Sequence, residues 1–338
     1  MIDNHPLVSI LVPVYKVEKY IERCARSLFE QTYDNIEYLF VDDCSPDNTI
    51  DILEEVVKDY PYRSSHIRII HHDINRGLAA ARNTAVSNCL TEWIMHVDSD
   101  DWLEPNTIEL MINKQKETDA DIVSAKVLRH TRTGDIELVV SDEEEKERFV
   151  LSTLGYDLHH ILCGRLIRRS LYDVGEICAE EGTNLGEDWQ VMPKLAWNAQ
   201  SFAFLNAVTY YYNCNRPGSY TYDYFNFSNN FEQNYRSWII INDFFSNKSL
   251  MFRQKVAQSG EILLFTHLHN ATIQKNKRAF YYIKDKILEL NPKAFKENEY
   301  CKGLRGIIKE HYMLYRLCVL GSKTVCFITS VRLNFSER

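Results

Sequence analysis

The stretch WIMHVDSDDW, residues 93–102, begins as an apolar run and ends in a cluster of carboxylates. A strand of a parallel sheet is buried on both faces, so its polar residues gather where it emerges, and ligands of open α/β sheets bind at the carboxyl ends of the strands. Side chains alternate along extended backbone, which places Asp98 and Asp100 on one side and Asp101 on the other. Neighbouring carboxylates repel, and a hard divalent cation such as Mg²⁺ or Mn²⁺ is a common reason for them to stand together.

A polar turn is the alternative interpretation of this cluster. Taken alone, the carboxylates are more typical of a turn that caps the helix following Pro105 than of a metal site. Motifs elsewhere in the chain are therefore needed to distinguish a metal site from a capping turn.

Strands and helices alternate on both sides of this stretch. Short apolar runs predict strands, and apolar stripes at helical spacing predict helices. The predicted strands are 8–14, 37–41, 67–70, 93–97, 121–127 and 202–213. The predicted helices are 18–32, a segment after Asp47-Asn48, 78–89 and 107–116, followed by helical periodicity from about residue 229. This alternation indicates right-handed βαβ units, so we predict an α/β fold with a mainly parallel, Rossmann-like central sheet.

The composition is that of an acidic globular protein. The chain has 338 residues, 45% of them hydrophobic, and its net charge of −8 argues against a general nucleic-acid binder. Its nine cysteines form no CxxC pair, which favours reduced thiols over disulfides or a zinc site. The first apolar run reads as a strand rather than a signal peptide, and no window supplies the roughly 18 apolar residues that span a bilayer. We therefore expect a cytoplasmic protein, free or peripheral at the inner face of the cytoplasmic membrane.

The ends of the first two predicted strands suit a nucleotide base. Pro13, Val14 and Tyr15 offer a rigid backbone edge and an aromatic face, and Asp42 and Asp43 end the second strand. These ends meet at one edge of a parallel sheet. A ring such as uracil could stack on Tyr15 and donate an N–H to Asp43. The alternative is a core tyrosine and a helix-capping aspartate.

Two arginines and an acidic pair carry further candidate chemistry. Arg76 lies at a turn into a helix and Arg82 lies six residues later, where guanidinium groups could bind a diphosphate; either could instead be a solvated surface arginine. Glu187 and Asp188 precede an apolar helix, whose dipole favours acid at its start. A carboxylate held there could also take a proton from an acceptor hydroxyl.

Five motifs in this order resemble family 2 of the glycosyltransferases. They are SILVPVYK, EQTYDNIEYLFVDDCSPDNT, NRGLAAARN, VDSDDWLEP and LGEDWQ, within about residues 7–220. The resemblance implies the GT-A fold and transfer of a sugar from a nucleotide-diphosphate donor, with inversion at the anomeric carbon and with Mg²⁺ or Mn²⁺ as cofactor. It also implies a catalytic domain over 1–225, whose donor-binding half ends near 128 and whose acceptor-side half follows, and a helical region over 226–338.

The resemblance also assigns roles to individual residues. The positions that match the family's base pocket are Pro13, Val14, Tyr15 and Asp43, with Asp42 beside the last. Arg82 matches a position near the donor, and Asp98, Ser99 and Asp100 match the DxD motif. Asp100 is then the direct metal ligand, and Asp98 contacts the ribose or the metal. Asp188 matches the catalytic base, and the loop with Arg216 and Ser219 resembles one that closes over the diphosphate.

The same resemblance also distinguishes between transferases that extrude a polymer and transferases that add single sugars. Polymer-extruding synthases of this kind have a QxxRW motif and several membrane helices, and the sequence has neither. We therefore expect single additions, from a donor that is a UDP-sugar, to a glycan or lipid-linked acceptor in bacterial surface polysaccharide synthesis. The alternatives are a sugar nucleotidyltransferase, which would have a Gly-rich basic loop where this chain reads VPVYKVEKY, and a non-catalytic binding module.

The last 38 residues differ in charge from the rest of the chain. Residues 301–338 carry a net charge of +5 and the preceding residues carry −13. Apolar residues recur there at helical spacing, and a basic amphipathic helix can bind an anionic membrane surface. The alternative is a helix that packs on the catalytic domain with solvated lysines.

Overall fold

The computed structural model describes residues 8–290, except 133, 157–158 and 217–226. It divides into two compact units, the first made of Met1–Asp223 with Arg236–Val256 and the second of Tyr224–Tyr235 with Ala257–Arg338. The predicted domain boundary at residues 225–226, and the basic segment 301–338, lie outside the described residues and stay predictions.

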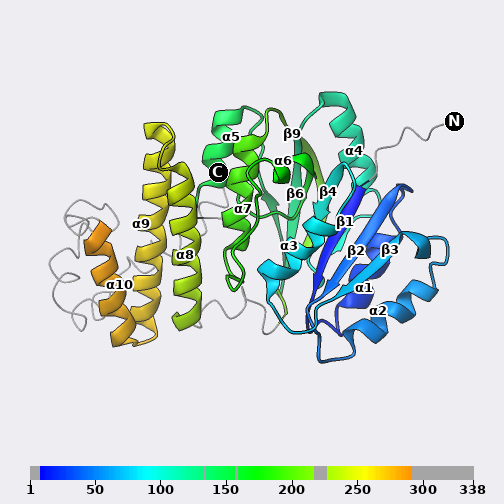
Figure 1. Cartoon of the computed structure of the whole chain (residues 1–338), viewed down its shortest axis with the longest axis horizontal. Coiled ribbons are helices and arrows are strands. Elements are labelled where there is room, and N and C mark those ends of the chain that lie inside the picture. The colour runs from blue at the N-terminus through cyan, green and yellow to red at the C-terminus, as the bar shows by residue number, and fades with distance from the viewer. Residues whose placement is uncertain (1–7, 133, 157–158, 217–226, 291–338) are drawn as a thin grey trace. The chain divides into compact units, whose positions relative to one another are not determined.

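The first half of the sheet is parallel, as Figure 1 shows. Its strands lie in the order β3 (Ile67–His71), β2 (Ile36–Asp42), β1 (Val8–Val14) and β4 (Trp93–His96). The connecting helices are α1 (Ile21–Phe29), α2 (Thr49–Lys58), the 3₁₀ helix η1 (Ser64–His66) and α3 (Leu78–Asn88). Every residue of β1 and β4 is buried, as expected for strands covered on both faces. The predicted α/β fold with a mainly parallel sheet is confirmed.

The second half of the sheet mixes directions. From β4 the order continues through β8 (Arg165–Arg168), β6 (Ile122–Thr131), β9 (Phe202–Asn213) and β5 (Trp102–Leu103), and β7 (Gly134–Val139) pairs with β6. β6 and β9 are parallel, whereas β8 runs antiparallel to both β4 and β6. The helices of this half are α4 (Thr107–Thr118), α5 (Lys146–Thr153), α6 (Ser170–Asp173) and α7 (Glu187–Asn198).

Three of these strands were missed by sequence reasoning. β5 has only two residues, β8 has four of which two are arginines, and nearly all of β7 is exposed. None of them carries a sustained apolar pattern, which is the signal that identifies a strand.

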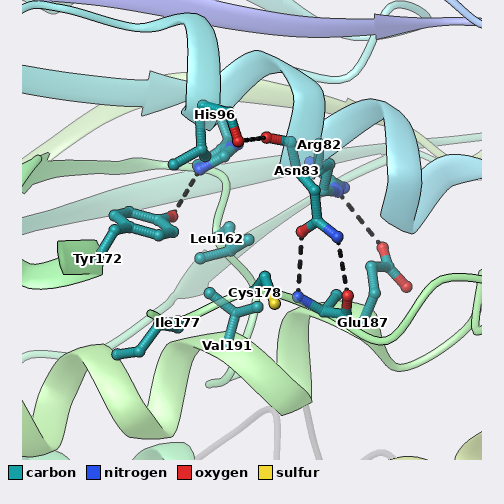
Figure 2. Close-up of a pocket in the computed structure, with 12 residues that line it drawn as sticks. Arg82, Asn83, His96, Leu162, Tyr172, Ile177, Cys178, Glu187 and Val191 are labelled. Carbon is teal, nitrogen blue, oxygen red and sulfur yellow. Dashed lines mark hydrogen bonds and ion pairs between the residues drawn. The ribbon is translucent and has the colours of Figure 1, made fainter. Parts of the chain in front are cut away.

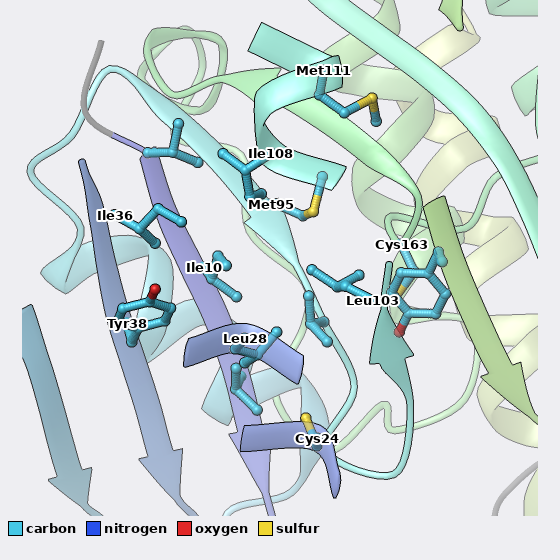
Figure 3. Close-up of a cluster of buried hydrophobic side chains, with 14 of the residues drawn as sticks. Ile10, Cys24, Leu28, Ile36, Tyr38, Met95, Leu103, Ile108, Met111 and Cys163 are labelled. Atoms are coloured by element: carbon cyan, nitrogen blue, oxygen red, sulfur yellow. The ribbon is translucent and has the colours of Figure 1, made fainter. Parts of the chain in front are cut away.

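One hydrophobic core lies between the sheet and the helices that cover it and includes residues of both halves, such as Ile10 and Met111 (Figure 3). α1 buries Cys24, Leu28 and Phe29 on one face, and the ring of Phe29 meets that of Tyr38 edge-on at 5.1 Å. Met95 of β4 belongs to the same cluster. Each such side chain contributes about 1.5–3 kcal/mol by leaving water, so this core holds the strand ends in register.

The second unit is helical. α8 (Phe227–Phe245) and α9 (Leu250–Ile273) contribute to both units, and α10 (Lys277–Leu290) lies in the second. Within that unit Phe231 packs against His267 of α9 and Tyr282 of α10, with ring centroids 5.3 and 6.0 Å apart. In the part of the chain that the model describes, no helix is long and apolar enough to span a bilayer.

Candidate active site

The parallel register brings the ends of four strands to one edge of the sheet. Val14 pairs with Asp42 and Asp42 with His71, while Leu11 of β1 pairs with His96 of β4. The residues that follow these strands are therefore neighbours, although they lie far apart in the sequence. Backbone hydrogen bonds continue the pattern, since Asp43 N–H donates to Val14 O and Val97 N–H donates to Leu11 O.

Arg82 of α3 is the centre of the acidic cluster at this edge. Its buried guanidinium lies 2.9 Å from Asp98, 3.5 Å from Glu187 and 3.7 Å from Asp188. Burial lowers the pKa of Arg82, but the three carboxylates together raise it well above its usual value. Its Nε and Nη1 lack a hydrogen-bond partner among the described residues. A buried cation with unused donors suits a ligand that brings further negative oxygens.

Asp188 lies in the first turn of α7, which begins after Gly186 in the left-handed conformation. One carboxylate oxygen accepts a 3.4 Å hydrogen bond from the Leu162 N–H, and the other has no hydrogen-bond partner in the described structure. Burial raises the pKa of Asp188, and Arg82 opposes this. The pKa of Glu187 rises to about 8, through burial and through the neighbouring Asp188. Asp188 therefore has one oxygen that accepts no hydrogen bond, although it lies 3.7 Å from Nη2 of Arg82.

The three aspartates after β4 have three different environments. Asp98 pairs with Arg82, and the carboxylate of Asp100 lies 3.2 Å from Nη1 of Arg216. Asp101 is fully buried and accepts hydrogen bonds from the Tyr210 hydroxyl at 2.6 Å and the Asn213 N–H at 2.7 Å. Ser99 between them is buried.

The carboxylates of Asp42 and Asp43 already accept hydrogen bonds from other groups of the protein. Asp43 is almost fully buried and accepts hydrogen bonds from the N–H groups of Arg76 (2.8 Å) and Gly77 (2.7 Å), with Nδ1 of His72 2.7 Å away. Gly77 has φ +90°, and a Cβ there would lie 2.3 Å from the Asn184 side chain, so this turn requires glycine. Asp43 thus shapes the entry to α3, and its contact with a base stays a prediction.

Asp42 and Arg76 have partners away from Arg82. Asp42 accepts a hydrogen bond from Ser45 N–H and lies 3.0 Å from Nδ1 of His71. The half-exposed guanidinium of Arg76 pairs with Glu181 at 2.6 Å. The structure therefore brings Arg82, rather than Arg76, to the acidic cluster.

Arg216 joins the end of β9 to the end of β1. Its Nη2 donates to the carbonyls of Tyr15 and Lys16, both at 3.2 Å, while Nη1 faces Asp100. Pro13 and Val14 are buried within β1, and Tyr15 is partly exposed. Ser219 lies outside the described residues. The proposed base-stacking residue and the proposed metal ligand are thus linked by one guanidinium.

A crevice of about 60 Å³ opens beside Arg82 and Glu187 (Figure 2). Asn83 exchanges two hydrogen bonds with the backbone of Ala179 at its edge, at 2.8 and 3.1 Å. His96 lies at 2.7 Å from the Tyr172 hydroxyl. Burial lowers the pKa of His96 to about 3, so this imidazole stays neutral at physiological pH and cannot act as a cationic group.

Hard oxygen ligands are available for a divalent cation at Asp98 and Asp100. In the described part of the chain, no three His, Cys, Asp or Glu residues gather to hold a metal ion by themselves. Mg²⁺ is commonly bound by one or two carboxylates and completed by water and substrate phosphates. The pair of carboxylates fits that kind of site.

Several contacts at this edge were missed by sequence reasoning. His72 follows β3 as Asp43 follows β2, so the strand-end rule could have found it. The Leu162 N–H, by contrast, has no side-chain signature. Tyr210 and Asn213 come from the predicted strand at 202–213, but only the fold brings them to Asp101.

Sequence comparison matches residues 9–174 to the model of Glycosyl transferase family 2. The chain is 30% identical to the uncharacterized glycosyltransferase EpsJ of Bacillus subtilis (strain 168), over 64% of this chain and 63% of that protein. It is 41% identical to the chondroitin synthase of Escherichia coli over 32% of this chain and 15% of that protein. The chain spans 48%, 38% and 63% of the length of the first curated relatives it matches.

Solved structures share the fold. The complex of S. aureus TarS residues 1–349 with UDP has a TM-score of 0.67 at 20% identity, covering 92% of this chain and 89% of that chain. The mannosyltransferase PcManGT of Pyrobaculum calidifontis, in complex with GDP-Man and Mn²⁺, has a TM-score of 0.54 at 15% identity, covering 95% and 89%. At these identities the likeness concerns the fold alone, and it confirms the GT-A fold that the motifs imply.

Proposed function

Because the chain belongs to glycosyl transferase family 2, we propose that it transfers a sugar from a nucleotide-diphosphate donor to a hydroxyl group, with inversion at the anomeric carbon. The observation that carries the proposal is the ion-pair cluster in which Arg82 lies between Asp98 and Asp188. It joins a candidate donor-binding group and a candidate base through one guanidinium.

The donor side of the site is the edge formed by β1, β2 and β4. Tyr15 would stack on the base, Asp43 with Asp42 would border it, and Arg82 would approach the diphosphate. Asp100 and Asp98 would hold Mg²⁺ or Mn²⁺, which when bound neutralises charge on the departing diphosphate as a Lewis acid. Relatives of known structure support a nucleotide donor, since they are complexes with UDP, UDP-GlcNAc and GDP-Man. We propose a UDP-sugar.

Asp188 would act on the acceptor side as the general base. In a single displacement the acceptor oxygen bonds to the anomeric carbon, the bond from that carbon to the diphosphate breaks, and the bonding pair leaves with the diphosphate. The acceptor proton goes to the Asp188 oxygen that accepts no hydrogen bond in the described structure. The Leu162 N–H on the other oxygen would hold the carboxylate in place. General-base assistance of this kind is worth about 10²–10⁴-fold.

The names of similar proteins support a role in glycan assembly. They include chondroitin and hyaluronan synthases of bacteria. We propose that the acceptor is a glycan or a lipid-linked precursor of a bacterial surface polysaccharide, with the protein in the cytoplasm or at the inner membrane face.

Thermal unfolding with a panel of nucleotide sugars tests the proposal. A UDP-sugar with Mn²⁺ at 100 times its Kd should stabilise the fold by about 2.7 kcal/mol, roughly a 5 °C rise in Tm. Incubation with the selected donor should then release nucleoside diphosphate. A sugar nucleotidyltransferase would instead release pyrophosphate from a nucleoside triphosphate and a sugar phosphate, and a binding module would raise Tm without turnover; either result contradicts the proposal.

The pH dependence of turnover should reflect the buried base. Burial raises the pKa of Asp188, and only its ionised form accepts a proton, so kcat/KM should rise with pH through a limb above the ordinary value of about 3.9. Rates measured from pH 4 to 9 check this, with Tm measured at each pH to exclude unfolding. A flat profile down to pH 4, or a rate that rises on acidification, would contradict the assignment.

A further inference from the structure

Arg165 is a fully buried cation that the proposed mechanism does not use. It begins β8, and its guanidinium donates to the carbonyls of Ile161, of His159 at 2.7 Å and of Val140 at 3.4 Å, and to the Ser124 hydroxyl at 3.3 Å. Within the described residues, Arg165 forms no ion pair of 4.0 Å or less; burial lowers its pKa to about 9, against the raising effect of Asp188. It is therefore still protonated at neutral pH. Burying a charge without an opposite charge in contact costs folding free energy, so we expect this guanidinium to serve a function.

The carbonyl of Ile161 and the N–H of Leu162 belong to the same peptide group. A trans peptide is planar, and its C=O and N–H point in opposite directions. Arg165 binds the C=O, and the N–H on the other side donates to Asp188. The direction of the N–H toward the carboxylate is thus set by the guanidinium. Hydrogen bonds in series also polarise one another, which strengthens the bond to the carboxylate.

The segment around this peptide is held at its other end by Gly164. Gly164 has φ +72°, its carbonyl accepts a 3.0 Å hydrogen bond from Ala125 N–H, and a Cβ there would lie 2.7 Å from Val127. The Leu162 N–H is consequently fixed from both sides, by Arg165 and by β6.

Charges on four elements face Asp188. The positive ones are Arg82 on α3 and Arg165 on β8, both of which lower the pKa of Asp188 against the raising effect of burial. The negative group that raises the pKa of Asp188 most is Asp98, which follows β4, and Glu187 on α7 precedes Asp188 in the chain. The thiol of Cys163 and the phenol of Tyr172 also interact with Asp188, whose charge raises the pKa of both beyond the effect of burial.

We infer that Arg165 is a positioning residue for Asp188. Arg165 acts through the Ile161–Leu162 peptide, whose N–H orients the Asp188 carboxylate and holds it in its ionised form. The inference rests on the proposed function for its effect on turnover. The coupling between Arg165, the peptide and Asp188 can be measured without any donor.

The chain contains a matched control for this residue. Arg63 is also buried, and it donates to the carbonyls of Phe29, Gln31, Tyr33 and Asp34 in the first half of the sheet. Arg63→Met therefore removes a similar guanidinium–carbonyl cluster, together with a 3.5 Å ion pair to Asp34, and none of these partners belongs to the contacts of Asp188. Loss of folding stability alone should appear in both variants.

The donor-free experiment follows the Leu162 amide resonance with pH in ¹⁵N-leucine-labelled full-length protein. We expect a titration step that is present in wild type and disappears in Asp188→Asn, and its midpoint is the quantity compared between variants. In Arg165→Met the midpoint should move to higher pH, and in Arg63→Met it should stay at the wild-type value. A wild-type midpoint in a folded Arg165→Met protein would overturn the inference.

The second experiment compares kcat with the KM for the donor selected by thermal unfolding. Misplacing a catalytic group by about 1 Å can cost up to about 10²-fold, so Arg165→Met should lower kcat by about 10–100-fold with a donor KM within about twofold of wild type. Arg63→Met should leave both unchanged. If Arg165→Met does not fold, Arg165→Lys keeps the charge, but its three N–H donors cannot satisfy all four acceptors that the planar guanidinium binds. A fivefold or greater loss of kcat in that variant supports the inference, and wild-type kcat overturns it.

The two proposals can fail separately. If no nucleotide sugar turns over in the wild type while the Leu162 midpoint still depends on Arg165, the proposed function is wrong and the coupling stands. If wild type turns over and Arg165 affects neither midpoint nor kcat, only the role of Arg165 is wrong.

Discussion

Replacing Asp188 with Asn is expected to lower kcat by about 10²–10⁴-fold while leaving nucleotide binding unchanged. The amide is isosteric with the carboxylate, so it fills the same place beside Leu162 N–H and Arg82, but it cannot accept the proton of an acceptor hydroxyl. Calorimetric binding of UDP with Mn²⁺ should remain within about threefold of wild type, and single-turnover transfer should be lost.

Glu187→Gln is the matched control for this experiment. Glu187 is adjacent in sequence and also contacts Arg82, yet its pKa of about 8 keeps it largely protonated at neutral pH. Gln therefore replaces a side chain that is already mostly uncharged at neutral pH, so kcat should change far less than in the Asp188 variant. Near-normal turnover by Asp188→Asn would exclude Asp188 as the base. A larger loss of kcat in Glu187→Gln than in Asp188→Asn would assign the role of base to Glu187.

Replacing Asp100 with Ala is expected to abolish the contribution of Mn²⁺ to donor binding. The carboxylate of Asp100 is one of two at the candidate metal site, and its present partner, Arg216, is a cation. A hard cation bound between carboxylates and phosphates loses much of its affinity when one carboxylate is removed. Calorimetry with UDP should show tighter binding with Mn²⁺ in wild type, by about tenfold or more, and no gain in Asp100→Ala.

Asp101→Asn separates the metal role from the fold. Asp101 is buried against the Tyr210 hydroxyl and the Asn213 N–H, and an asparagine oxygen can still accept one of these bonds. This variant removes a carboxylate from the same turn, yet it should keep the gain from Mn²⁺. An equal gain in wild type and Asp100→Ala would refute the assignment of Asp100 as a metal ligand.

Much of the fold follows from local pattern. The buried runs at 8–14 and 93–97 are apolar because strands of a parallel sheet are covered on both faces, and they were predicted for that reason. β7 could not be predicted in this way, since it is an exposed strand at the side of β6. The residues of β8 also gave no signal, because the buried Arg165 is polar and its partners are backbone carbonyls.

The candidate site likewise has parts that local sequence pattern predicts and parts that only the fold brings together. The prediction that Asp101 points away from Asp98 and Asp100 assumed extended backbone, whereas β4 ends at His96 and the Asp101 N–H closes a turn on the Asp98 carbonyl at 3.0 Å. Asp101 is buried against β9 because of contacts that this turn and the fold create. The meeting of Arg82 with Asp188 depends on the path of the chain between them, which no spacing in the sequence encodes. The Leu162 N–H is a backbone group, so its role is independent of residue type and invisible to motif analysis.

The contacts of Asp101 have a consequence for the order in which the chain folds during synthesis. Its partners, Tyr210 and Asn213, lie 109 and 112 residues further along the chain. Strands β1 to β4 can therefore leave the ribosome and pair before the groups that satisfy this carboxylate have been made. Contacts of such long sequence separation form slowly. The edge of the sheet that carries the acidic cluster is consequently completed only after β9 has been synthesised, late in folding.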